Sequence, residues 1–210
     1  MRKGLLGVAV LGAASGGAAW AASRRRPLHQ PGPGAARAVV LGAGFGGLSA
    51  AKALADGRGD LDLHVLLIDQ HNYQLFTPIL YQVATGGVGP DNIAHPVRHV
   101  SRAHGFQFRE STVQRIDLDD RCVYTDDGPV RYDFLVVALG STTSFFGLAD
   151  VEEHSLTLKT LGDGITIRNR ILDAFERADV ETDPDRRRAL LTFIVVGGGY
   201  TGVELVSSIR

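Results

Sequence analysis

The chain has 210 residues, of which 44% are hydrophobic and 21% are charged, a globular composition that excludes wholesale disorder. Cys122 is the single cysteine, which excludes a disulfide framework, a Cys-rich zinc site, an iron–sulfur cluster and an intrachain redox disulfide within one chain. The net charge is −1, but residues 1–55 hold basic residues and no acid, whereas the remainder is acidic. The body is therefore not a general nucleic-acid binder.

The N-terminal region begins with an uncharged apolar stretch, residues 4–23, which is long enough to span a bilayer core as a helix. Basic residues flank it at 2–3 and 24–26, and this charge pattern favours an N-out, C-in membrane anchor. Residues 19–21 also fit the cleavage site of a secretory signal peptide. A disordered or wrongly assigned extension is the third alternative. Residues 27–37, rich in proline and glycine, are typical of a linker.

The first glycine motif follows this linker. Residues 38–41 form a short apolar run that predicts a buried parallel strand, and residues 42–47 read G-x-G-x-x-G before a helical pattern. In such a turn Gly42 allows the tight bend, Gly44 lets a pyrophosphate approach the backbone, and Gly47 lets the helix pack closely on the strand. The helix N-terminus then faces the phosphates.

A second strand is predicted over residues 64–68, and it ends at Asp69. An acid at the end of this strand can accept hydrogen bonds from an adenosine ribose. Strand, glycine turn, helix and acid together predict a dinucleotide site. The alternative is a glycine-rich turn that binds nothing.

A second glycine motif occupies residues 197–202, after an apolar run at 192–196 that predicts another strand. Its glycines are Gly197, Gly199 and Gly202. Two such units predict two dinucleotides on one chain, FAD on the first and NADH or NADPH on the second, so that flavin and nicotinamide meet. The second strand of this unit is missing, which leaves NADH and NADPH as alternatives.

These patterns predict an α/β chain. A Rossmann-type FAD-binding domain, a parallel sheet with a β-meander at about 107–139, is expected over residues 36–150. It follows the apolar segment and linker at 1–35. A connecting helix and turn are expected over 151–190, and the first βα unit of an NADH-binding Rossmann domain over 191–210.

Residues 67–86 carry the most specific pattern, and they resemble type II NADH dehydrogenases. These are single-subunit, FAD-containing NADH:quinone oxidoreductases of the two-dinucleotide-binding-domain flavoprotein superfamily, related to the pyridine nucleotide-disulfide oxidoreductases. Further matching segments are residues 93–98, 132–141, 158–161, 167–176 and 197–204. The resemblance covers residues 38–210 and corresponds to about the N-terminal half of a typical member.

The resemblance implies a cofactor-binding role for several positions. The residues expected to line the FAD pyrophosphate are Gly42, Gly44, Phe45, Gly46 and Gly47. Asp69 would hold the ribose, and the backbone of Val113, in a strand at 111–114, would meet the adenine. Ala138 and Gly140 would form a second FAD-contacting turn. Leu139 and Tyr200 depart from the family pattern, in which Thr and Pro are common.

Two further residues are expected near the redox centre. Gln82 would lie near the isoalloxazine, and Glu204 near the junction of nicotinamide and flavin. The alternative for Gln82 is an ordinary polar loop residue. For Glu204 it is an acid in the first helical turn, favoured by the helix dipole.

The resemblance also implies the partners: NADH and a quinone would be the substrates. The charges that flank residues 4–23 favour a location at the cytoplasmic face of the membrane, with this segment as an N-terminal anchor that the family does not usually have. Whether the protein forms a homodimer is left open. We expect the 210-residue chain alone to be inactive. The alternatives are a non-catalytic truncated or split FAD-binding remnant, and a reductase of the same superfamily with another acceptor.

Other motifs receive simpler interpretations. His95 and His99 have a zinc-ligand spacing, but Pro96 and the lack of a further ligand argue against a metal site, so none is predicted. A packing helix is expected over 161–178 and a solvated turn at 186–188. Cys122, in a predicted hairpin, is interpreted as structural.

Overall fold

A four-stranded parallel sheet forms the centre of the computed structural model, which describes residue 32 and residues 34–209. Its strands are β1 (Ala36–Leu41), β2 (Leu63–Asp69), β5 (Gln107–Glu110) and β9 (Phe134–Val137), in the order β5-β2-β1-β9. Short apolar runs suit this position because both faces of a parallel sheet are normally covered. The strand predicted from residue 38 thus starts two residues earlier, inside the expected linker.

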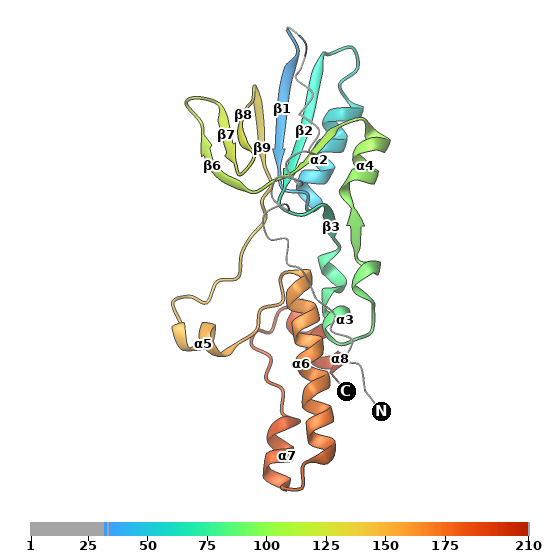
Figure 1. The fold of residues 1–210 in the computed structure, drawn as a ribbon, viewed down its shortest axis with the longest axis vertical. Helices are drawn as coiled ribbons and strands as arrows, with labels where there is room; N and C mark the ends of the chain where they lie inside the picture. The colour runs from blue at the N-terminus through green and yellow to red at the C-terminus, as the bar shows by residue number, and fades with distance from the viewer. Residues whose placement is uncertain (1–31, 33, 210) are drawn as a thin grey trace, which may run out of the picture. The chain divides into compact units, whose positions relative to one another are not determined.

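One face of the sheet is covered by α2 (Phe45–Asp56) and α4 (Val97–His104), which contact each other and lie on one side of β1 and β2 in Figure 1. The strand register aligns Val40 with Leu67 and Val136, and Leu67 with Phe108. This row belongs to the main hydrophobic cluster together with the apolar face of α2. The first βαβ unit therefore has the core that the sequence predicts.

The β-meander is smaller than predicted. It consists of β6 (Val113–Asp117), β7 (Cys122–Thr125) and β8 (Gly128–Arg131), paired antiparallel in a sheet of their own. The two ends of the expected 107–139 range belong instead to the parallel sheet, as β5 and β9. The antiparallel and parallel strands look alike in sequence because each is a short run of alternating or apolar residues. Cys122 is buried in β7 with 3% exposure, as a structural role requires.

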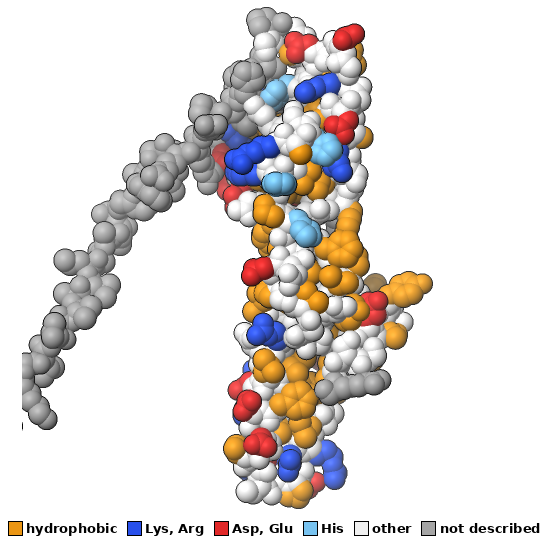
Figure 2. Space-filling model, turned by 90° about the vertical axis from the view of Figure 1, so that its right-hand side faces the viewer, with side chains coloured by type: hydrophobic (Ala, Val, Ile, Leu, Met, Phe, Trp, Pro, Cys, Tyr) orange, Lys and Arg blue, Asp and Glu red, His pale blue; other side chains and the backbone are white. Residues whose placement is uncertain are grey.

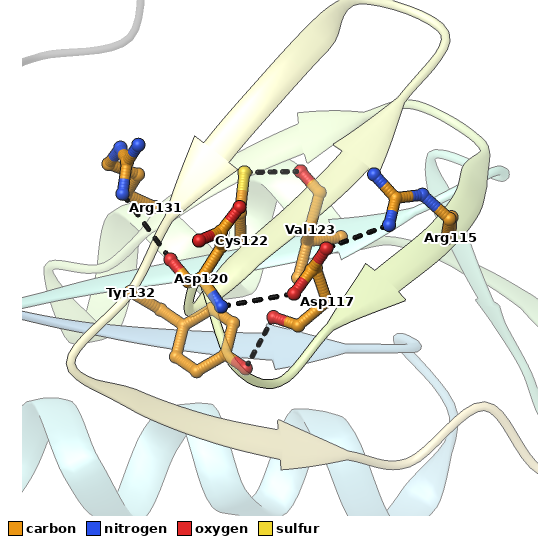
Figure 3. A network of polar contacts seen from close by, with 7 residues as sticks. All are labelled: Arg115, Asp117, Asp120, Cys122, Val123, Arg131 and Tyr132. Atoms are coloured by element: carbon orange, nitrogen blue, oxygen red, sulfur yellow. Dashed lines mark hydrogen bonds and ion pairs between the residues drawn. The ribbon is translucent and has the colours of Figure 1, made fainter.

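A polar network fastens the end of the meander where β6 meets β7 (Figure 3). The Asp117 carboxylate accepts a 2.8 Å hydrogen bond from the Arg115 guanidinium and a 3.0 Å bond from the backbone N–H of Asp120. The Tyr132 hydroxyl donates to the carbonyl of Asp117 at 3.3 Å. These contacts hold the β6–β7 hairpin to the chain that leads into β9.

Short elements connect the sheet to the helical part of the chain (Figure 1). Strand β3 (Tyr73–Leu75) pairs with β4 (Ala94–Pro96). Between them lie the 3-10 helix η1 (Thr77–Ile79), α3 (Leu80–Ala84) and the 3-10 helix η2 (Pro90–Asn92). The buried face of α3 packs against α6 (Leu161–Val180) and contacts α8 (Tyr200–Ser208). The expected helix at 161–178 is confirmed by α6, whose N-terminus has a capping box of Thr160 and Asp163.

Two further helices are α5 (Ala149–His154) and α7 (Pro184–Leu190). The turn predicted at 186–188 is wrong, because these arginines lie within α7. The Asp183 carboxylate accepts hydrogen bonds from the N–H groups of Asp185 and Arg186, and Pro184 occupies the first helical position. An Asp-Pro pair of this kind is a helix-start signal.

The strand predicted at 192–196 is absent, since residues 192–198 have no regular secondary structure. No strand of the described region pairs with this segment. Ile194 and Val196 are accordingly 85% and 77% exposed. An extended apolar segment becomes a strand only when a neighbour takes up its backbone hydrogen bonds, and that cannot be read from the segment itself.

Figure 2 shows apolar side chains at the surface in the helical part of the chain. The exposed apolar residues of α6 and α8 include Leu172, Phe175, Val203 and Val206. Among the described residues, no helix is long and apolar enough to cross a membrane. The predictions for residues 1–31 fall outside the part of the chain that the structure describes.

Candidate nucleotide-binding sites

The first glycine loop joins β1 to α2 as predicted. Gly42 has a φ of +96°, which favours glycine, and its N–H donates to the Ile68 carbonyl at 2.8 Å. A Cβ at Gly42 would overlap the carbonyl oxygen of Ala138, and a Cβ at Gly47 would overlap the carbonyl oxygen of Gly42. The two outer glycines are therefore required by the packing of the loop itself.

Gly44 differs from these two. It is the N-cap of α2, has ordinary dihedral angles, and no atom outside the adjoining residues lies within 4 Å of the position that its Cβ would take. No side chain makes a capping hydrogen bond to this helix, so its first N–H groups, at the positive end of the helix dipole, are left for a ligand. The loop thus offers the space and the donors that the pyrophosphate of a dinucleotide such as FAD would require.

Asp69 lies at the end of β2, beside this loop. One carboxylate oxygen accepts a 2.6 Å hydrogen bond from the N–H of Ala43, and the other accepts a 2.7 Å bond from the N–H of His71. A carboxylate has about four acceptor positions, so both oxygens retain capacity for ribose hydroxyls. Burial and the nearby Asp69 carboxylate raise the pKa of the Tyr73 phenol, which keeps that hydroxyl protonated.

Val113 is the first residue of β6, so the strand starts two residues later than predicted. It follows the carboxyl end of β5, where the Ser111 N–H donates to the Asp69 carbonyl at 2.8 Å. The segment that leads into the expected adenine-contacting backbone is therefore hydrogen-bonded to the main chain of the expected ribose-binding acid.

The second FAD-contacting turn follows β9. The N–H of Ala138 donates to the Leu41 carbonyl at 2.8 Å, and its side chain lies against Gly46 and Gly47. Gly140 has a φ of +77° and is exposed. The structure therefore brings Ala138 directly against the first glycine loop, with Gly140 two residues beyond it.

Phe45 and Gln82 extend the site toward the helical part of the chain. The ring of Phe45 contacts that of Phe76 edge-to-face, with centroids 5.6 Å apart, and this links the glycine loop to the segment leading into α3. Gln82 lies in α3, not in a loop, and its side-chain amide donates to the Tyr81 hydroxyl at 3.1 Å. Half-buried Gln82 thus faces a local partner, and its proposed flavin contact stays a prediction.

The second glycine loop repeats the geometry of the first, although the preceding strand is missing. Gly197 has a φ of +113°, and a Cβ at Gly202 would overlap the Gly197 carbonyl oxygen. Gly199 is the N-cap of α8, with open space around it. A loop of this form can receive a second pyrophosphate.

Glu204 lies in the second turn of α8, not in the first, so the helix dipole gives little reason for an acid there. It is half-buried. Because α8 contacts α3, the elements that carry Glu204 and Gln82 lie next to each other.

Sequence reasoning missed the contribution of Asp126, in the turn between β7 and β8. Its carboxylate accepts hydrogen bonds from the N–H of Thr112 at 2.9 Å and from the Ser111 hydroxyl. Asp126 and Gly128 indicate a hairpin turn, but nothing in their spacing indicates which distant segment they contact.

The two histidines weighed as zinc ligands lie on different elements. His95 lies in β4 opposite Gln74, and His99 lies in α4. Among the described residues, no group of three His, Cys, Asp or Glu side chains is placed to hold a metal ion.

Comparison with known proteins places these loops in context. Residues 36–210 match the family model for pyridine nucleotide-disulphide oxidoreductases. A type II NADH:quinone oxidoreductase of Mycobacterium tuberculosis is 42% identical over 191 residues, which cover 89% of this chain and 40% of the relative. The chain therefore spans well under half the length of that protein.

Two solved structures share the fold. NDH2 from Plasmodium falciparum, in complex with RYL-552, has a TM-score of 0.73 at 24% identity, covering 83% of this chain and 36% of that one. The sulfide:quinone oxidoreductase of Aquifex aeolicus has a TM-score of 0.59 at 27% identity, covering 68% and 33%. The Rossmann-type parallel sheet predicted from the sequence is confirmed.

Proposed function

Because this chain belongs to the pyridine nucleotide-disulphide oxidoreductase family, we propose that its first glycine loop binds FAD and that it serves NADH:quinone oxidoreduction. The observation that carries the proposal is the open space at Gly44, at the uncapped start of α2 and beside the Asp69 carboxylate. The similarity to a type II NADH:quinone oxidoreductase supports the substrate classes. A bound FAD supplies the redox chemistry, which carries two electrons from NADH to a quinone.

In this proposal, each part of FAD is bound by a different segment of the chain. The N–H groups at the start of α2 would hold the pyrophosphate, Asp69 the ribose, and the backbone near Val113 the adenine. Ala138 and Gly140, after β9, would form the side of the FAD site opposite Asp69. Between this loop and α8 lie two contacts: the ring of Phe45 contacts that of Phe76, and α3, which carries Gln82, contacts α8.

The second loop is proposed to bind NADH through Gly197, Gly199 and Gly202. Its geometry matches that of the first loop, and α8 places Glu204 on the element that contacts α3. Glu204 would then lie near the place where nicotinamide meets flavin. Hydride transfer requires the reacting atoms to be about 3–3.5 Å apart, so both loops must be held firmly.

In the described part of the chain, few packing contacts hold the second loop in place. Residues 192–198 form no strand, and Ile194, Val196 and Tyr200 are more than three-quarters exposed. This favours a second candidate function, an FAD-binding chain that does not turn over NADH by itself. We accordingly propose that the 210-residue chain alone lacks NADH:quinone activity. Measurement of NADH oxidation with a short-chain quinone distinguishes the two, and strong turnover would exclude the second candidate.

Titration of the purified chain with FAD, followed by flavin fluorescence, tests the central proposal. We expect saturable binding that Gly44→Val abolishes, since the side chain would fill the space of the pyrophosphate. Gly32→Val is the matched control, because it also enters open space but lies outside the loop. Preference of the first site for NADH over FAD would contradict the proposal.

Location and assembly also stay proposals. We propose association with the cytoplasmic face of a membrane through residues 4–23, which lie outside the described residues, and leave a homodimer as an assembly to be measured. Membrane fractionation of the full chain and of a variant lacking residues 1–31, with light scattering of the latter, tests both.

A further inference from the structure

The turn between β7 and β8 is tied to the segment that enters β6. Asp126 makes a reciprocal pair with Thr112: its carboxylate accepts from the Thr112 N–H at 2.9 Å, and its own N–H donates to the Thr112 carbonyl at 3.1 Å. Both main-chain polar groups of Thr112 are thereby engaged by one residue. The meander thus holds the backbone immediately before Val113.

Ser111 extends this connection to the parallel sheet. Its side chain is buried, with 4% exposure, and its hydroxyl donates to the Asp126 carboxylate. Its N–H donates to the carbonyl of Asp69 at 2.8 Å. A continuous set of hydrogen bonds therefore runs from Asp126 through Ser111 to Asp69.

We propose that Asp126 and Ser111 are positioning residues for the adenosine half of FAD. They fix the main chain at Thr112 and Val113, which would receive the adenine, relative to the Asp69 carboxylate, which would receive the ribose. The inference rests on the proposed binding of FAD at the first glycine loop. Recognition by main chain has no side-chain rotamer to adjust, so its geometry depends on how firmly that segment is held.

A bulge reinforces the need for such a restraint. Val113 pairs with Thr125, but the register shifts between Val113 and Arg115, so this pair is cut off from the regular pairing of Arg115–Asp117. A bulge redirects the strand locally and interrupts the ladder. The contacts of Asp126 with Thr112 therefore add a second restraint beside the isolated Val113–Thr125 pair.

The opposite end of the meander, where β6 meets β7, provides a matched control. Asp117 closes the network of Figure 3 at the opposite end of β6, roughly 13 Å from Val113 at about 3.3 Å per residue. Asp117→Ala removes carboxylate hydrogen bonds to Arg115 and Asp120, as Asp126→Ala removes those to Ser111 and Thr112. Both variants loosen the meander, but only one loosens it at the proposed adenosine site.

The test is a titration of each variant with FAD and with ADP, together with its melting temperature. We expect Asp126→Ala to weaken both ligands by the same factor, about tenfold, as for a lost charge-assisted hydrogen bond. Asp117→Ala should lower the melting temperature but change either affinity less than twofold. Asp126→Asn should restore binding to within about twofold, because its amide oxygen still accepts from Ser111 and Thr112.

The outcomes separate this inference from the proposed function. If the wild-type chain binds neither FAD nor ADP, the proposed function fails and the inference fails with it. If the wild type binds both but Asp126→Ala and Asp117→Ala weaken binding equally, or Asp126→Ala affects FAD alone, only the positioning role is overturned. Should Asp126→Ala not fold, Ser111→Ala decides, with an expected loss of about threefold for both ligands and no loss contradicting the role.

Discussion

The backbone N–H of Ala43 donates a 2.6 Å hydrogen bond to the carboxylate of Asp69, which joins the first glycine loop to the end of the neighbouring strand. The second carboxylate oxygen accepts from the N–H of His71. One side chain thus fixes the loop and the chain that leaves β2, while facing the proposed ribose site.

This arrangement predicts that Asp69→Asn is nearly as harmful as Asp69→Ala. An amide presents only one oxygen, so its NH2 group would face one of the two main-chain donors. We expect the free energy of unfolding to fall by about 1–3 kcal/mol, as for a buried donor left without an acceptor, and FAD affinity to fall with it. Chemical denaturation and FAD titration measure both. Asp62→Asn, at an exposed position before β2, is the control and should change neither; an intact Asp69→Asn variant would contradict the dual role.

The position of Asp69 could be predicted from sequence, because an apolar strand, a glycine turn and a helix follow one another at short range. The same local order located α2 and the first residues of the site. The hydrogen bond to Ala43 could not be predicted, since it depends on how two strands align side by side. Ser111 and Asp126 were missed for the same reason: they are 15 residues apart, and only the fold brings them together.

In the region at 192–196, a local sequence pattern predicts an element that the fold does not form. Its apolar residues are typical of a strand, but strand formation requires a partner, and the described part of the chain has none there, so the predicted strand is absent. The glycine turn that follows needs no partner. The close approach of Gly202 to the Gly197 carbonyl, which a Cβ at residue 202 would overlap, is a local property of the turn, so it persists without the strand.

The first glycine loop predicts two separable effects. Gly47→Ala should destabilise the fold, because its Cβ would overlap the Gly42 carbonyl oxygen, which is backbone and cannot turn aside. Gly44→Ala should leave the melting temperature nearly unchanged, since its Cβ enters open space and its dihedral angles suit any residue. FAD affinity should fall in both. Equal melting temperatures for the two variants would show that the loop does not pack as described.

The meander predicts a dependence of stability on pH. The backbone N–H of Asp120, and then the Arg115 guanidinium, hold the pKa of Asp117 below its ordinary value of 3.8. A carboxyl with a lowered pKa in the folded state stabilises that state above its unfolded pKa, and the stabilisation is lost as the pH falls through the folded value.

The difference in stability between wild type and Asp117→Asn should therefore be present at neutral pH and narrow as the pH falls below 3.8. Urea denaturation of both proteins at pH 7 and across the acid range measures it. Arg115→Met should show the same trend, since it removes the partner of the ion pair. A difference that stays constant or widens toward acid would contradict the role of the Asp117 charge.

The last prediction concerns Gly164, which lies at the contact between α6 and α3, and its effect on the free energy of unfolding. It is buried within α6, and a Cβ there would lie 3.1 Å from the Leu80 Cδ1 and 3.4 Å from the Val83 Cγ1. Gly164→Ala combines this tight contact with a gain in helix propensity of up to about 1 kcal/mol, so we expect a small net change in the free energy of unfolding.

Gly164→Val adds two more methyl groups at the same place and should lower the free energy of unfolding by about 1–3 kcal/mol through overpacking. Because α3 carries Gln82, the displacement should also reach the helix proposed to approach the flavin. Gly162→Ala is the control, since its Cβ would make only an ordinary 3.7 Å contact with Thr160 Oγ1. Chemical denaturation of the three variants decides: if Gly164→Val is as stable as Gly162→Ala, α6 does not depend on glycine to approach α3.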